Sequence, residues 1–342
     1  MNLNPNSSFP KNFALIMFGV VVVLLISNII ITKFVNKDEQ PKNREALFGV
    51  EIDSSFHTAL KNFGFSDSWI LKKKIKNISG DSLFASYSVK VPKDVPIHLL
   101  ILELKDIFWE YDAKIDAEEI VSAKKTILQI ESDNKLKLAA ELFYDEKVMR
   151  EYGTVSFLVN DLPLQNDELL NNFLKTPELS YCVLIPNSDS KKHLSALSKA
   201  GKRFALLLND DITELDYKLS ANYSDERLLR SIKEIVGTFY SAAFFIVDVK
   251  SDLFESSKFS FIENQLKKRS ITIVTTAKLQ TLNSNSINVE NEFQNFMLSV
   301  QKRDEKILMV NADQFVTIST LIPSYRKIGY KFIYPGDIVI KR

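Results

Sequence analysis

The chain has 342 residues, enough for about two domains at roughly 150 residues each, and its 45% hydrophobic and 25% charged composition excludes wholesale disorder. Its 44 basic and 43 acidic residues leave a net charge of +1, which gives no electrostatic support for nucleic-acid binding, and its nine glycines form no nucleotide-binding loop. One cysteine and three scattered histidines exclude an intrachain disulfide and the common zinc motifs.

The first element in chain order is a run of nineteen uncharged, mostly apolar residues at 13–31. A helix of this length covers the hydrocarbon core of a bilayer, so we expect one membrane-spanning helix. The predicted divisions are a polar tail at 1–10, an anchor at 11–33 and a linker at 34–46. A cleaved signal peptide is the alternative, but the run exceeds a usual signal core and no typical cleavage site follows it.

Basic residues are unevenly placed around this segment. Lys33, Lys37, Lys42 and Arg44 follow it, whereas only Lys11 precedes it. Taken alone, this bias predicts that the bulk of the chain lies in the cytoplasm.

Residues 47–148 are predicted to form a small, two-layer α+β domain. A helix with Phe56, Leu60 and Phe63 on its apolar face ends near Gly64, and an alternating strand covers 83–91. Three further elements follow: an apolar helix over 95–112, and two strands at 124–131 and 135–144 that form a hairpin across the polar turn between them.

Residues 152–342 alternate short apolar runs with longer amphipathic ones, which predicts parallel βα units in a barrel or a doubly wound sheet. We expect a (β/α) barrel-like domain of about seven parallel strands. Cys182 lies inside the second strand, which predicts an inert buried thiol. The predicted strands are 155–159, 179–185, 203–208, 242–247, 271–274, 306–310 and 330–334.

Polar residues follow most of these strands, and in parallel βα architectures ligands bind at the carboxyl ends of the strands. If they bind a cation, all-oxygen ligands favour Mg²⁺, Ca²⁺ or Mn²⁺ over zinc. The alternative is that they act as turn and helix-capping residues. The candidates are Asn160 and Asp161 for catalysis, Asn187, Asn209, Asp210 and Asn311 for substrate binding, and Asp161, Asp248 and Asp313 for a metal.

The order of segments across 152–342 resembles the divergent polysaccharide deacetylase family, a branch of the barrel-type carbohydrate deacetylases. The resemblance depends on FLVNDL at 157–162, the span at 177–208, AAFFIVDVKS at 242–251, and ILMVNADQFVTISTL leading to IYPGDIVIK. It implies a metal-dependent hydrolase that removes acetyl groups from a glycan, with an N-terminal membrane segment and a small module ahead of the barrel.

The motif positions depart from the family's pattern. The family's first strand ends in two aspartates, a proton acceptor and then a metal ligand, whereas this chain has Asn160 and Asp161. Leu207 and Asp248 stand where the family has histidines, Thr275 stands where it has an aspartate, and Asn311-Ala312-Asp313 replaces Gly-His-Pro. An amide has no useful basicity, and zinc loses its best ligands with the histidines.

We therefore expect a membrane-anchored, deacetylase-like protein that is catalytically inactive and binds an envelope polysaccharide or an envelope protein. The resemblance places its body outside the cytoplasm, against the charge bias. Two alternatives stay open: an active deacetylase with an aspartate-rich metal site, and an envelope scaffold. We expect no cofactor unless that metal site is active, and no nucleic-acid or nucleotide partner.

Overall fold

The computed structural model describes residues 17, 44–75, 83–150, 152–282 and 288–340. Within these ranges, no helix has both the length and the apolar character needed to cross a membrane. The predicted membrane segment at 13–31 lies outside them, apart from Met17, as do the polar tail and most of the linker. The anchor therefore stays a prediction.

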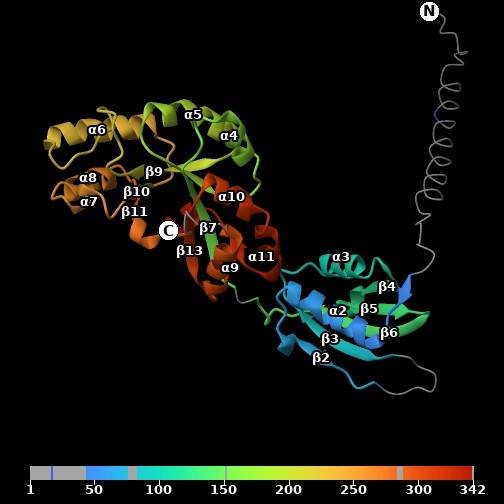
Figure 1. Ribbon diagram of the computed structural model, residues 1–342. Helices are drawn as coiled ribbons and strands as arrows, with labels where there is room; N and C mark the ends of the chain where they lie inside the picture. Colours follow the sequence, from blue (N-terminus) through green and yellow to red (C-terminus); the bar gives the residue numbers. More distant parts are fainter. Residues whose placement is uncertain (1–16, 18–43, 76–82, 151, 283–287, 341–342) are drawn as a thin grey trace, which may run out of the picture.

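The first folded unit is a six-stranded mixed sheet with two helices on one face (Figure 1). The helices are α2 (Gly49–Asn62) and α3 (Ile97–Ile107), and the strand order is β1-β4-β5-β6-β3-β2. Alternate residues of the central strands pack against both helices in one apolar core. The strands are β1 (Glu45–Ala46), β2 (Ile70–Lys72), β3 (Ala85–Val91), β4 (Tyr111–Ile120), β5 (Lys125–Ser132) and β6 (Lys135–Tyr144).

The predicted hairpin is confirmed. Strands β5 and β6 pair antiparallel, and Asp133 and Asn134 between them have φ values of 54° and 53°. Two successive positive φ values are what a tight hairpin turn requires, and Asp and Asn tolerate this region better than most residues.

The helix predicted over 95–112 is wrong at its end. It stops at Ile107, and Tyr111 begins strand β4, which pairs antiparallel with β5 from Ala113 to Ile120. Most β4 side chains are exposed, so the strand lacks the apolar alternation that would have revealed it. Strands β1 and β2 were also missed, because they contain only two and three residues.

The second unit contains eight parallel strands in one curled sheet, and all seven predicted strands are among them. The path is β11-β10-β9-β8-β7-β13-β12, and β14 pairs with the beginning of β7. The additional strand is the two-residue β12. The strands are β7 (Thr154–Asn160), β8 (Tyr181–Leu184), β9 (Arg203–Leu208), β10 (Phe245–Val247), β11 (Ile273–Thr275), β12 (Gln280–Thr281), β13 (Glu305–Asn311) and β14 (Lys331–Phe332).

This sheet is not a closed barrel. Strands β11 and β12 are at its two ends, and no pairing joins them in the described part of the chain. Among the helices within residues 152–282 and 288–340, α4 to α11 contribute to the larger core on one face of the sheet, whereas α12 contributes to the smaller core on the other face. One-sided coverage distinguishes a half-barrel from a doubly wound sheet. The helices are α4 (Asp167–Leu174), α5 (Ser188–Lys199), α6 (Asp225–Thr238), α7 (Asp252–Glu255), α8 (Phe259–Lys267), α9 (Val289–Ser299), α10 (Ala312–Ser319), α11 (Ile322–Ile328) and α12 (Pro335–Val339).

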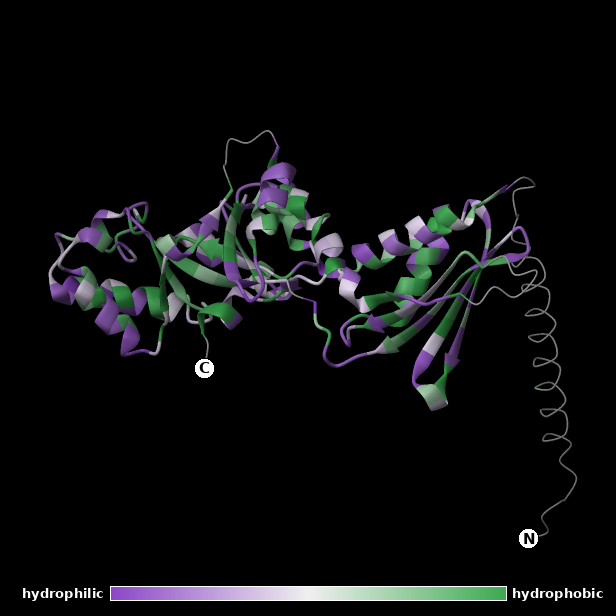
Figure 2. Cartoon of the chain, turned by 90° about the horizontal axis from the view of Figure 1, so that it is seen from below, coloured by the Kyte–Doolittle hydropathy of each residue, from purple (hydrophilic) through white to green (hydrophobic). Residues whose placement is uncertain are grey.

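Both faces of the central strand β7 are buried. Val155, Phe157 and Val159 point into the larger core, and Leu158 points into the smaller one. Burial on both faces explains why this strand is a continuous apolar run in the sequence. In Figure 2 the strands of this unit are mostly hydrophobic and the outer turns mostly hydrophilic.

Candidate functional site

The carboxyl ends of β7 and β13 place two predicted amides side by side. Asn160 and Asn311 end the two strands and are register partners in the parallel ladder. Neighbouring strands lie about 4.8 Å apart, so both residues are at the same edge of the sheet. Asn311 also caps α10, with its backbone N–H donating to Gln314 Oε1 at 3.0 Å.

Three of the predicted residues line one small cavity at this edge. Asn160 ends β7 and Asp161 follows it, and Asn187 follows β8. Together with Ser190 and Leu207 they surround a volume of about 160 Å³. Leu207 stands where the resembled family has a histidine, so this wall of the cavity is apolar.

Asn160 and Asp161 form a fixed pair at the rim of this sheet-edge cavity. The Asn160 amide donates from Nδ2 to Asp161 Oδ2 at 3.1 Å. The other amide atom, Asn160 Oδ1, is buried, and no group in the described part of the chain donates a hydrogen bond to it. Asp161 has a φ of 48°, which turns the chain sharply away from the strand. A buried acceptor without a donor is rare in native structures, and a ligand or a water can satisfy it.

Asn187 has a structural role. Its side chain caps α5 by accepting from the backbone N–H of Ser190 at 2.7 Å. The neighbouring Ser188 donates from both its backbone N–H and its hydroxyl to Glu214, at 2.7 and 2.8 Å. Sequence reasoning missed Glu214, because its partner lies 26 residues away and no motif links them.

Asn209 and Asp210 lie outside this cavity and stabilise turns. Asn209 donates from Nδ2 to Asp211 Oδ2 at 2.7 Å and accepts from the Asp211 backbone N–H. Asp210 accepts from the backbone N–H of Asp252 at 2.8 Å, which links the ends of β9 and β10. Both contacts are those of turn residues.

Asp248 connects two strand ends. Its Oδ1 accepts from the Lys250 backbone N–H and from the Thr276 hydroxyl, both at 3.1 Å. Thr276 was not predicted, although it directly follows Thr275, the position at which the resembled family has an aspartate. Asp313 lies exposed in the first turn of α10, where a carboxylate favours the helix N-terminus.

The predicted metal ligands do not fit a metal site. Among the described residues, no group of three histidine, cysteine, aspartate or glutamate side chains is placed to hold a metal ion. Asp161 accepts from Asn160, Asp248 accepts from two local donors, and Asp313 is on the surface of another element. A hard divalent cation needs several oxygen ligands converging on one point, and these carboxylates do not supply them.

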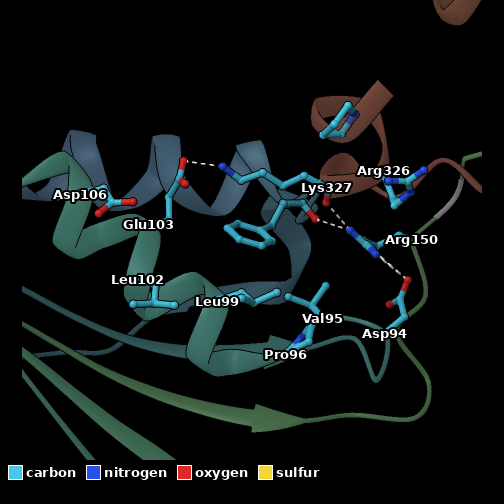
Figure 3. Close-up of a pocket in the computed structure, with 12 residues that line it drawn as sticks. Asp94, Val95, Pro96, Leu99, Leu102, Glu103, Asp106, Arg150, Arg326 and Lys327 are labelled. Atoms are coloured by element: carbon cyan, nitrogen blue, oxygen red, sulfur yellow. Dashed lines mark hydrogen bonds and ion pairs between the residues drawn. The ribbon is translucent and has the colours of Figure 1, made fainter. Parts of the chain in front are cut away.

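A larger cleft lies where the two units meet (Figure 3). Its volume is about 550 Å³, and Leu99, Leu102 and Asp106 on one face of α3 point into it. Pro323 and Arg326 of α11 line the opposite side. This junction cleft was not predicted, because its two walls are more than 200 residues apart in sequence.

Arg150 joins the two units beside this cleft. Its Nε and Nη2 donate to Asp94 Oδ2 at 3.0 and 2.8 Å, and its Nη1 donates to the carbonyl oxygens of Phe63 and Lys327. Lys327 in turn forms an ion pair with Glu103 at 2.6 Å. The polar groups of the junction therefore pair with one another and fix its geometry.

No protein-family model matches the chain, and no curated protein matches it either. Several solved structures do match. One is a mutant of a CE4 family pseudoenzyme from Bacillus anthracis, described as having restored enzymatic activity. It has 10% identity to this chain and a TM-score of 0.39, and the match covers 66% of this chain and 92% of that one. An uncharacterized protein from Agrobacterium tumefaciens C58 has 11% identity and a TM-score of 0.38, covering 57% and 92%.

Bacillus subtilis PdaA, a family 4 carbohydrate esterase, has 12% identity and a TM-score of 0.35, covering 56% of this chain and 82% of that one. All three similarities have TM-scores below 0.4 and identities of 10–12%.

Proposed function

We propose that this chain is a membrane-anchored, deacetylase-like protein that binds a cell-envelope saccharide without hydrolysing it. The observation that carries the proposal is the sheet-edge cavity. It presents the Asn160 amide where a hydrolase would need a base, and the residues that the structure describes place no group of metal ligands around Asp161.

Hydrolysis of an acetyl group requires a base to activate water and an acid for the leaving group. Asn160 can supply neither, because an amide does not titrate in the physiological range. The Asp161 carboxylate accepts from Asn160, and Asp210 and Asp248 do not line the cavity and accept local hydrogen bonds that stabilise turns. What this edge offers a ligand is hydrogen bonding.

A saccharide matches that chemistry. Its hydroxyl groups can donate to the exposed Asp161 carboxylate, which Asn160 holds at the rim, while Leu162, Leu164 and Leu207 give the cavity an apolar wall. The volume of about 160 Å³ is below the roughly 300–1,000 Å³ of usual ligand pockets, so the cavity accommodates one edge of a sugar ring.

The anchor and its orientation belong to the same proposal. The uncharged run at 13–31 supports a single membrane helix, and the resemblance to envelope deacetylases supports a body outside the cytoplasm. The basic residues after the run favour the opposite orientation. A reporter fused to the C-terminus and tested for protease accessibility in intact cells decides between the two.

The function is tested with the full chain in a detergent that has no sugar head group. Binding to an acetylated envelope polysaccharide is measured by co-sedimentation, and acetate release is measured in the same samples with and without added divalent metal. We expect saturable binding and no acetate release. Asn160→Ala should weaken binding about tenfold, because it removes the hydrogen bond that holds the Asp161 carboxylate at the rim.

Asn171→Ala is the matched control, because this asparagine lies exposed on α4 away from the cavity. A second variant, Asn160→Asp, restores a carboxylate at the base position and should still release no acetate, since the metal ligands are not assembled. Acetate release by the wild type would contradict the proposal, and release by Asn160→Asp alone would show that Asn160, and not the metal ligands, keeps the wild type inactive. Failure to bind any acetylated polysaccharide would favour the scaffold alternative.

A further inference from the structure

A third pocket, separate from the sheet-edge cavity and the junction cleft, is lined by neutral residues. It has a volume of about 430 Å³ and lies between the segment after α2 and the residue that leads into β7. No side chain in its lining carries a charge. Its lining residues, here called the aromatic pocket, are Gly64, Phe65, Ser66, Ser68, Trp69 and Tyr152.

Contacts with neighbouring aromatic side chains hold the rings of Trp69 and Tyr152 in place. Trp69 contacts the buried Phe65 edge to face, with ring centres 6.0 Å apart. Tyr152 packs against Tyr330 at 4.7 Å, and the Tyr330 hydroxyl donates to the Met297 carbonyl at 2.9 Å. Rings fixed in this way bind a ligand without a large loss of conformational entropy.

Gly64 allows the pocket wall to approach the second unit. It has a φ of +73°, and a Cβ at this position would lie 2.0 Å from the Ile328 carbonyl oxygen and 3.1 Å from the Tyr152 ring. No other residue fits this turn without moving the wall.

Polar groups of the pocket are available to a ligand. Within the described ranges, the Trp69 indole N–H and the Tyr152 hydroxyl have no hydrogen-bond partner, and both side chains are half-buried. The exposed hydroxyls of Ser66 and Ser68 share one hydrogen bond of 2.9 Å and keep further acceptor positions.

We propose that the aromatic pocket is a second binding site for a neutral saccharide of one or two pyranose rings. A pyranose has an apolar C–H face, which packs on an aromatic ring, and a rim of hydroxyls, which pairs with indole, phenol and serine groups. A phosphate, carboxylate or ammonium ligand would find no counter-charge in the lining. The volume is within the usual range for small-molecule sites.

This site lies apart from the sheet-edge cavity. Tyr152 precedes β7 and Asn160 ends it, and eight residues of extended chain span roughly 26 Å. The proposal therefore shares with the proposed function only the class of ligand, and each site has its own variants.

The two tryptophans of the chain provide a direct test. Trp109 is exposed and lies in the first unit after α3, so Trp109→Phe leaves Trp69 as the only indole fluorophore. This variant, as the full chain in a detergent without a sugar head group, is titrated with chitotriose, tri-N-acetylchitotriose and cellotriose, and with trigalacturonate as an anionic trimer. We expect a saturable change in emission with cellotriose and tri-N-acetylchitotriose, and at least tenfold weaker responses to the two charged trimers.

In the Trp109→Phe background, Tyr152→Phe should weaken binding about fivefold by removing one hydroxyl. In the wild-type background, Trp69→Phe should lose the emission change, because only Trp109 is left to report. Circular dichroism and thermal melting check that each variant is folded. No emission change of folded Trp109→Phe with either neutral trimer, or an equal response to the charged trimers, overturns the proposal.

The variant Asn160→Ala distinguishes binding at the aromatic pocket from binding at the sheet-edge cavity. In the Trp109→Phe background, Asn160→Ala should leave the Trp69 signal unchanged. A signal lost with Asn160→Ala would place the bound saccharide at the sheet edge and refute a site at Trp69.

Discussion

At the scale of single residues, chemistry at the predicted site depends on which polar atoms are already paired. Asn160, Asp161 and Asn187 lie at neighbouring strand ends and line one cavity. Asn209, Asp210 and Asp248 instead accept hydrogen bonds from nearby backbone groups. Aspartate and asparagine have the same sequence signature as ligands and as turn residues, so only geometry separates the two roles.

Cys182 carries a prediction of its own. It is fully buried in β8, and burial raises the pKa of its thiol to about 12. The unfolded thiol ionises near pH 9, so the folded state gains stability from the protonated thiol below that pH and loses it as the pH rises toward 12.

Between about pH 8 and about pH 10, we expect the wild type to lose about 1.4 kcal/mol more unfolding free energy than Cys182→Ala. Urea denaturation at both pH values, with a reducing agent present, measures the difference. Native protein should also resist thiol alkylation near pH 8. If the free energy of unfolding changed equally in the two proteins between these pH values, the pKa of this thiol would be the same in the folded and unfolded states.

At the scale of elements, burial decided which strands could be predicted. The seven predicted strands of the second unit are short apolar runs because parallel strands covered by helices are buried. Strand β4 was missed because its outward side chains are solvated, and its backbone pairing with β5 leaves no trace in hydropathy.

The β5–β6 turn gives a prediction at this scale. Asn134 has a φ of 53°, a region that costs alanine about 1 kcal/mol and glycine almost nothing. Asn134→Ala should lower the free energy of unfolding by about 1 kcal/mol, and Asn134→Gly should maintain or raise it. Chemical denaturation measures the free energy of unfolding of both variants. An alanine variant more stable than the glycine variant would contradict the turn assigned here.

At the scale of the whole molecule, the junction between the units depends on contacts that span the chain. Arg150 donates to carbonyls on α11 and at the end of α2, and the Lys327–Glu103 ion pair joins α11 to α3. None of these partners is suggested by a local motif, since Arg150 and Lys327 are 177 residues apart. This is why neither the junction cleft nor the aromatic pocket was predicted.

We expect Arg150→Ala to loosen this junction, because two carbonyls and the Asp94 carboxylate lose their donor at once. Hydrogen–deuterium exchange should rise several-fold at residues 148–153 and at the end of α11, with little change in the centre of either sheet. Lys93→Ala is the control, because it removes only an exposed ion pair with Glu146. Unchanged exchange in Arg150→Ala would mean that apolar packing alone holds the units together.

The central position of β7 has a consequence for synthesis on the ribosome. Its neighbours β13 and β14 are made about 150 and 175 residues later, whereas every strand pair of the first sheet lies within residues 45–144. The first unit can therefore complete its sheet while the second is still being translated. Until residues 305–332 emerge, one edge of β7 is open and its apolar side chains lack their partners, so a chaperone that binds extended apolar segments would act at this stage.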